Sequence, residues 1–115
     1  MKNIYMNIVQ NIVDCSGIKL ISKDADGKEV GRAFLYIMHN GLHDKPFGFM
    51  EDVYVAEEMR GRGLGTSLVK RIIELAREKK CYKLVSTSRH SREKVHKLYL
   101  KLGFKDQGKE FRIDF

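Results

Sequence analysis

The feature that most constrains this chain is a glycine-rich loop joining a predicted strand to a predicted helix. The apolar run Phe47–Val55 has the composition of a strand. Gly61, Gly63 and Gly65 follow it, and apolar residues then recur at helical spacing over Thr66–Lys80. Because glycine lets the backbone approach a ligand closely, and the first amides of a helix lack intrahelical acceptors, this arrangement predicts an anion site.

Two common phosphate loops do not fit the sequence. A P-loop requires a lysine before its Ser or Thr, but Thr66 directly follows Gly65. The dinucleotide fingerprint G-x-G-x-x-G fails because the three glycines are spaced two apart. Arg60–Gly65 (RGRGLG) instead fits the pattern R/Q-x-x-G-x-G/A.

With this pattern the chain resembles the GCN5-related N-acetyltransferase (GNAT) family, in which such a loop binds acetyl-CoA. Two more segments support the resemblance. Met50–Val55 is similar to the family's fourth strand, and Leu98–Phe104 (LYLKLGF) is similar to its late signature. The motifs occur in the family's order and span roughly the last two thirds of the chain.

Composition predicts a single cytoplasmic domain over residues 1–115. Hydrophobic residues make up 43% and charged residues 32%, as in ordinary globular proteins, and no signal peptide or membrane-length apolar run is present. Cys15 and Cys81 are isolated and read as reduced, buried thiols. The net charge of +7 favours an anionic partner such as CoA, with nucleic acid as the rival, although solvated lysines account for most of it.

The pattern of the chain predicts mostly antiparallel strands followed by a β-loop-α-β-α-β half. A hairpin turn is expected at Asp24–Gly27, which lacks the further acidic positions of a calcium loop. Besides Phe47–Val55 and Thr66–Lys80, the pattern predicts strands at Gly17–Lys23, Lys28–His39 and Tyr82–Ser88, a helix at Ser91–Leu102, and a closing strand or hairpin at Phe104–Phe115. Asn3–Val13 has apolar residues at helical spacing but β-branched composition, so a helix and a strand are both open there, and a strand is favoured.

These elements predict an α+β sandwich with a mixed, mostly antiparallel central sheet flanked by helices, which is the GNAT fold. The family usually has two helices between its first and second strands. Here only Asp14–Gly17 separates the two expected strands, so that helical pair is missing. We therefore expect an open acceptor site, or a site completed by a second subunit in a homodimer.

The resemblance implies acetyl-CoA as cosubstrate and no metal. The pantetheine arm would bond to backbone groups of Val53 and Val55, with a backbone N–H near Val53 as the oxyanion donor. Arg92 stands where the family often has an asparagine that contacts the cofactor, so it is a substitute candidate. The pyrophosphate would bind to Arg60, Gly61, Arg62, Gly63, Leu64, Gly65 and Thr66.

Two residues are candidates for proton transfer. Glu51 matches the position of a family glutamate that acts as the base, directly or through water, and Asp52 is the alternative. Adjacent strand residues face opposite sides, so only one can reach the acceptor unless a bulge intervenes. Tyr99 matches the family's general acid for the departing thiolate, and its alternative role is in the core. His39, His43, His90 and His96 do not form a metal set.

The leading hypothesis is an N-acetyltransferase that moves an acetyl group from acetyl-CoA to a primary amine within a ternary complex. The acceptor is a peptide, protein or small molecule, and the open face favours a peptide or protein. One alternative is a non-catalytic module that senses CoA or binds a protein. Another is a basic nucleic-acid-binding domain, against which the lack of interleaved aromatic and basic residues argues.

Overall fold

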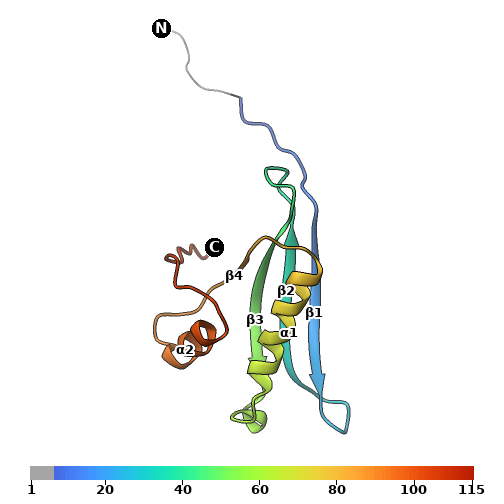
Figure 1. The fold of residues 1–115 in the computed structure, drawn as a ribbon, viewed down its shortest axis with the longest axis vertical. Coiled ribbons are helices and arrows are strands. Elements are labelled where there is room, and N and C mark those ends of the chain that lie inside the picture. The colour runs from blue at the N-terminus through green and yellow to red at the C-terminus, as the bar shows by residue number, and fades with distance from the viewer. Residues whose placement is uncertain (1–6) are drawn as a thin grey trace.

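The protein is described by a computed structural model that covers residues 7–115, in which four strands form one sheet and two α-helices follow the third and fourth strands (Figure 1). In chain order the elements are β1 (Cys15–Lys23), β2 (Glu29–Met38), β3 (Phe47–Val55), the 3-10 turn η1 (Glu57–Met59), α1 (Leu64–Glu78), β4 (Leu84–Ser86) and α2 (Glu93–Lys101).

The sheet has the order β1-β2-β3-β4. The first three strands are antiparallel and β4 lies parallel to β3, so the mixed sheet expected from the sequence is confirmed. The β1–β2 turn forms because the Asp24 carboxylate accepts hydrogen bonds from the amides of Asp26 and Lys28, both at 2.9 Å. Gly27 supplies the positive φ of 83° that this turn requires.

Helix α1 covers one face of the sheet and buries the core against it (Figure 1). Alternate residues of β2 point to this side, and Leu35 and Met50 from β2 and β3 are 0% and 1% exposed. The buried face of the helix repeats at helical spacing, as expected, and Ile73 beside it is half-buried. Its buried residues are Leu68, Val69, Ile72, Leu75 and Ala76.

Glycine in β2 lets the start of α1 approach the sheet. A Cβ at Gly31 would lie 3.0 Å from the Leu64 side chain and 3.2 Å from that of Leu68. The helix therefore begins close above β2, at Leu64 rather than at Thr66, and ends at Glu78 rather than at Lys80.

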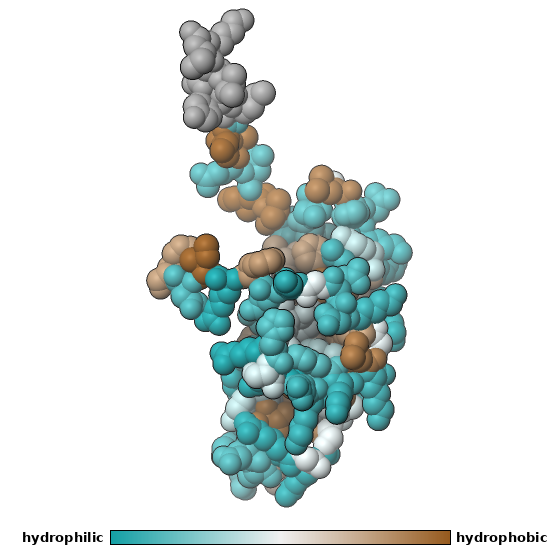
Figure 2. Space-filling view, turned by 90° about the vertical axis from the view of Figure 1, so that its left-hand side faces the viewer, coloured by the Kyte–Doolittle hydropathy of each residue, from teal (hydrophilic) through white to brown (hydrophobic). Residues whose placement is uncertain are grey.

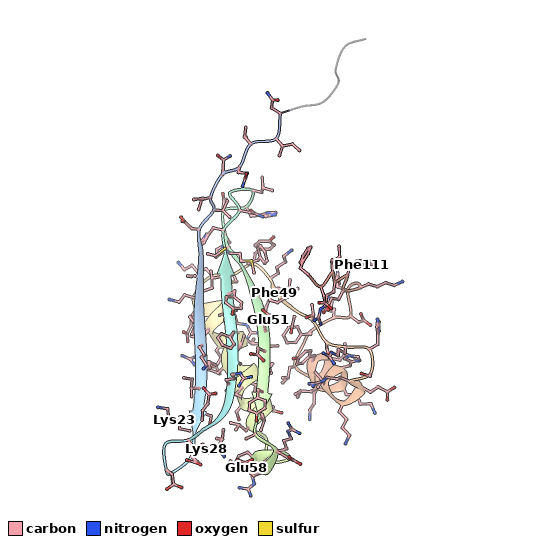
Figure 3. The ribbon with its side chains drawn as sticks, turned by 180° about the vertical axis from the view of Figure 1, so that it is seen from behind. Lys23, Lys28, Phe49, Glu51, Glu58 and Phe111 are labelled. Carbon is pink, nitrogen blue, oxygen red and sulfur yellow. The ribbon has the colours of Figure 1, made fainter. Side chains whose placement is uncertain are left out.

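No helix of the described chain covers the opposite face of the sheet, which Figure 3 views directly. Phe34 and Tyr36 are half-buried there, with ring centroids 6.0 Å apart and planes only 9° from parallel. Phe49 lies opposite Tyr36, and Glu51 lies opposite Phe34. Within residues 7–115, α1 therefore covers one face of the sheet, and no helix precedes β1.

Both ends of the described chain differ from expectation. Residues 3–6 of the expected first strand lie outside the described residues, and residues 7–14 form no strand, with Ile8 and Ile12 94% and 100% exposed (Figure 2, upper part). The expected closing strand at 104–115 is also not formed, and Phe111 and Ile113 are 90% and 78% exposed. Alternating apolar residues do not make a strand without a partner strand to bond.

The two later elements are shorter than the sequence pattern indicated. The ladder between β4 and β3 covers only Leu84–Ser86 instead of 82–88, and α2 covers Glu93–Lys101 instead of 91–102. The residue before α2 is Arg92, and its side chain makes no capping hydrogen bond. Gly103 does follow the helix with a φ of 105°, as a C′ glycine should.

Candidate active site

A β-bulge interrupts β3 beside its two carboxylates. Phe34 pairs with Glu51, but Arg32 pairs with Tyr54, so two residues of β3 face one residue of β2. Asp52 takes the extra position with a φ of 52°, in the left-handed region. The alternation of side chains is thereby broken, and Glu51 and Asp52 are both exposed, whereas a regular strand would expose only one of them.

The bulge also changes which backbone groups of β3 face away from β2. The amide of Gly48 points toward the β4 side, where it donates to the Lys83 carbonyl at 2.9 Å. Beyond the bulge, Ala56 donates to Val30 of β2, while the Val55 carbonyl faces the other way and accepts a bond from Arg60. Because strand groups alternate, the backbone groups of Val53 lie on the same outer side as those of Val55.

Strands β3 and β4 separate at this point. Their parallel ladder pairs residues 48–50 with residues 84–86 and ends there. At this end of the ladder, Ser86 Oγ donates a hydrogen bond to the Met50 carbonyl at 3.3 Å. The outer edge of β3 from residue 51 to 55 therefore has no β4 partner. We call this unpaired stretch of the β3 edge the splay. The contact expected between a pantetheine arm and the backbone of Val53 and Val55 requires such an opening.

The loop after β3 is an open backbone cradle. Gly61 and Gly63 have φ of 80° and 83°, and a Cβ on either would meet nothing within 4 Å. Helix α1 begins directly after Gly63, and its first intrahelical bond runs from the Ser67 amide to the Gly63 carbonyl. The amides of Leu64, Gly65 and Thr66 thus have no intrahelical acceptor and can bind an anion.

Arginines flank this cradle, and one of them is already engaged. Arg60 Nε donates to the Val55 carbonyl at 3.1 Å, which fixes the loop to the end of β3. Arg62 Nη1 lies 4.0 Å from the Met59 sulfur, and its guanidinium makes no ion pair within residues 7–115. Lys28 links the β1–β2 turn to η1 through an ion pair with Glu58, whose Oε1 lies 3.2 Å from Lys28 Nζ (Figure 3, lower end). A backbone hydrogen bond and the ion pair with Lys28 lower the pKa of Glu58.

The two candidate bases have different surroundings. Asp52 is paired with Arg32, whose Nε lies 3.3 Å from Oδ2. Glu51 lies on the open face with Phe49 (Figure 3), and within the described residues its carboxylate has no ion pair or hydrogen bond. Of the two carboxylates, Asp52 is therefore the one engaged in an ion pair, and that of Glu51 has no partner among the described residues.

Tyr99 is held by the end of its own helix. The amide of Phe104 bonds to the Tyr99 carbonyl at 3.0 Å and that of Gly103 bonds to Leu100, which is a Schellman motif. The rings of Tyr99 and Phe104 pack with centroids 5.2 Å apart, and both rings contact the core. Helix α2 lies on the β4 side of the sheet, beside the edge of β3 (Figure 1). Tyr99 therefore combines an anchored ring with a position on the side of the splay.

Other candidate groups lie elsewhere. Arg92 is exposed before α2, and its carbonyl accepts the amide of His96. Cys81 is half-buried, and burial raises the pKa of its thiol. Cys15 is exposed, not buried as expected, and it begins β1 at the end of the sheet that lies far from the glycine loop. In the described residues no group of three or more His, Cys, Asp or Glu side chains gathers as a metal site, and no helix could span a membrane.

Sequence reasoning missed Arg32 as part of this site. It also left open whether a bulge occurs, although the sequence contains a signal. Two adjacent charges, Glu51 and Asp52, interrupt the alternation of a strand that otherwise has apolar residues on both sides of them. A strand can place two adjacent polar residues on one side only at a bulge.

A mixed sheet whose parallel strands separate beside a glycine cradle is the arrangement of an acyl-CoA-dependent acetyltransferase. Residues 8–104 match the Acetyltransferase (GNAT) family. The chain therefore belongs to the GNAT family, as its motifs indicated.

Three relatives show how far this similarity extends. The aminoglycoside N(6′)-acetyltransferase type 1 of Stenotrophomonas maltophilia is 30% identical over 102 residues, covering 86% of this chain and 67% of the relative. The glucosamine 6-phosphate N-acetyltransferase of Trypanosoma brucei brucei is 35% identical, covering 84% and 64%. The crystal structure of a Trypanosoma brucei acetyltransferase superposes with a TM-score of 0.78 at 31% identity, covering 86% and 69%. The chain thus spans about two thirds of their length.

Proposed function

We propose that this protein transfers an acetyl group from acetyl-CoA to a primary amine, directly and within a ternary complex. The observation that carries this proposal is the junction of the splay with the glycine cradle at the end of β3. The cradle offers amides for the pyrophosphate, and the β3 edge offers backbone groups for the pantetheine arm. Acetyl-CoA supplies the acyl group as a thioester.

In this proposal the cofactor contacts come mainly from the backbone. Val53 and Val55 contribute backbone groups on the outer edge of β3, and the Val53 N–H is the oxyanion donor. Arg62 and the outer nitrogens of Arg60 add charge to the phosphate site, and Arg92 is a further phosphate contact. The remaining members of the cradle are Gly61, Gly63, Leu64, Gly65 and Thr66.

Two side chains then move protons. The amine nitrogen forms a bond to the thioester carbonyl carbon, and Glu51 accepts the proton that the nitrogen loses. The carbon–sulfur bond breaks, and Tyr99 gives its phenolic proton to the leaving thiolate before regaining one from solvent. A phenol of pKa about 10 can protonate a thiolate whose thiol has a pKa of about 8.5 at a small cost.

The acceptor is proposed from the relatives. Two of them are named for amino-sugar acceptors, an aminoglycoside and glucosamine 6-phosphate. We therefore propose an amino sugar as the first acceptor class to test, ahead of the peptide or protein that the open face alone favours.

The test incubates the purified protein with acetyl-CoA and, separately, glucosamine 6-phosphate, an aminoglycoside, thialysine and a lysine peptide, with product detected by mass spectrometry. We expect acetylation of at least one amine and a fall in kcat of about 100-fold or more in Glu51→Gln. Initial rates are plotted in double-reciprocal form against one substrate at several concentrations of the other. Intersecting lines would support a ternary complex, whereas parallel lines would indicate an acyl-enzyme intermediate and contradict direct transfer. Binding of CoA with no product from any amine would contradict the catalytic proposal.

A further inference from the structure

The β3 bulge is held by a side chain from the neighbouring strand. Arg32 of β2 meets the Asp52 carboxylate with two nitrogens, Nε at 3.3 Å from Oδ2 and Nη2 at 3.5 Å from Oδ1. The guanidinium also stacks over the Tyr54 ring, with its carbon 4.6 Å from the ring centroid. Arg32 thus contacts both the residue at the bulge and the residue just beyond it.

Such a contact is needed because the bulge is costly in two ways. Asp52 has a left-handed φ of 52°, which is unfavourable in a residue other than glycine. The bulge also lies where β4 no longer pairs with β3, so no ladder bond restrains the outer side. The bidentate ion pair with Arg32 holds Asp52 from the β2 side.

Further charged side chains lie on the same face as Arg32. Glu29 on the same strand lies 3.7 Å from Nη1 of Arg32, and Glu29 is in turn 2.9 Å from Lys19 of β1. The Asp52 carboxylate, chiefly through its hydrogen bonds, raises the pKa of Arg32 further, so the cation is permanent. This row of charges crosses three strands on the face opposite α1.

The pairing separates the roles of two adjacent carboxylates. Without Arg32, the carboxylates of Glu51 and Asp52 would be free side by side on the exposed side of the bulge. With Arg32 in place, Asp52 is neutralised by an ion pair, and Glu51 keeps a carboxylate without a partner among the described residues.

We propose that Arg32 is a positioning residue for acetyl transfer. Paired with Asp52, it holds β3 in the bulged form that turns the Val53 N–H toward the splay and leaves Glu51 free to accept the proton of the amine. The proposal rests on the function proposed above, and nothing in it requires Arg32 to touch acetyl-CoA or the acceptor.

The experiment compares Arg32→Gln, Arg32→Lys, Asp52→Asn and the double variant Arg32→Gln/Asp52→Asn with the wild type. Lys19→Gln is the matched control, because Lys19 is also a cation on this face, paired with Glu29 and lying over the Phe34 ring, but it does not contact Asp52. Two quantities are measured: amide hydrogen exchange of residues 50–55, and kcat and KM on the best acceptor of the panel above.

We expect Arg32→Gln to speed exchange in residues 50–55 and to lower kcat by about 10- to 100-fold, with a smaller effect on the KM for acetyl-CoA, because misplacement of the reacting groups by about 1 Å has that effect on the rate. Arg32→Lys should recover part of kcat, the double variant should fall no further than Arg32→Gln, and Lys19→Gln should match the wild type. Non-additivity of this kind marks two residues that act as one unit.

Each contrary result is distinct. Unchanged exchange in Arg32→Gln would overturn the role of Arg32 in holding the bulge, whatever the activity. Faster exchange with unchanged kcat, or an equal loss in Lys19→Gln, would overturn the positioning role. A wild type that acetylates no amine would overturn the proposed function and the positioning role together, while the exchange data would still report on the bulge.

Discussion

At the scale of single residues, the site depends on a few backbone conformations as much as on side-chain chemistry. Asp52 and the two cradle glycines adopt positive φ, and these three positions turn the backbone groups that the proposed cofactor site uses. The glycines adopt this conformation freely, whereas in Asp52 it is less favourable than in glycine. Residue identity therefore matters here chiefly through what the backbone can do.

Tyr99→Phe tests the role proposed for the phenol. We expect kcat to fall by about 100-fold with no change in CoA affinity, because the ring and its contact with Phe104 remain while the proton donor is lost. Steady-state kinetics and calorimetry with CoA measure the two effects. An unchanged kcat, with chemistry shown to be rate-limiting, would leave Tyr99 as a core residue only.

Gly31→Ala tests the close approach of α1 to β2. The new Cβ would lie 3.0 Å from the Leu64 side chain, so we expect the free energy of unfolding to fall by about 1–3 kcal/mol. Urea unfolding measures it. Gly108→Ala is the control, because a Cβ there meets nothing within 4 Å and the backbone is not left-handed. Equal stability of the two variants would contradict the tight packing.

At the scale of elements, the ends of the two helices are fixed by the same motif. Helix α2 ends in a Schellman motif with Gly103 at C′, and α1 ends in one with Lys80 there, where the Cys81 amide bonds to the Ala76 carbonyl at 2.9 Å. Lys80 therefore takes a φ of 61°, which glycine would adopt at lower cost.

Lys80→Gly should accordingly stabilise the protein, although glycine destabilises the interior of a helix by its flexibility. We expect the free energy of unfolding to rise by about 0.5–1 kcal/mol, measured by denaturant unfolding. Lys79→Gly is the control: Lys79 has an ordinary φ of −82°, so glycine there should lower stability. Destabilisation by both variants would contradict the assigned helix end.

How far the sequence predicts these elements depends on what each element needs from its surroundings. β3 was predicted with its bounds, and α1 to within two residues, because nine residues of β-type composition and a 3.6-residue apolar repeat are local signals. The terminal strands were wrong because apolar alternation does not provide a partner strand. The pairing of Arg32 with Asp52 joins residues twenty positions apart and depends on a register that no local pattern encodes.

At the scale of the whole molecule, the sheet presents two unlike faces. One is covered by α1 and carries the buried core, and the other exposes aromatic rings, Glu51 and the charge row of Arg32 (Figure 3). The glycine cradle and the splay meet at the end of β3, between these faces. This places the proposed cofactor site beside an open surface from which an acceptor can approach Glu51.

The central claim is that acetyl-CoA binds at the cradle after β3. The most direct test is a thermal melt at fixed, moderate salt, with and without acetyl-CoA, for the wild type, Gly63→Asp and Gly63→Asn. Both side chains are among those that tolerate the left-handed φ of residue 63 best, but only aspartate places a negative charge where the phosphates would bind.

A ligand at about one hundred times its dissociation constant stabilises the folded state by about 2.7 kcal/mol. We predict a clear rise in Tm for the wild type, a smaller rise for Gly63→Asn, and none for a Gly63→Asp protein that remains folded. An equal rise in all three proteins would place the cofactor elsewhere, and no rise in a folded wild type would contradict the claim.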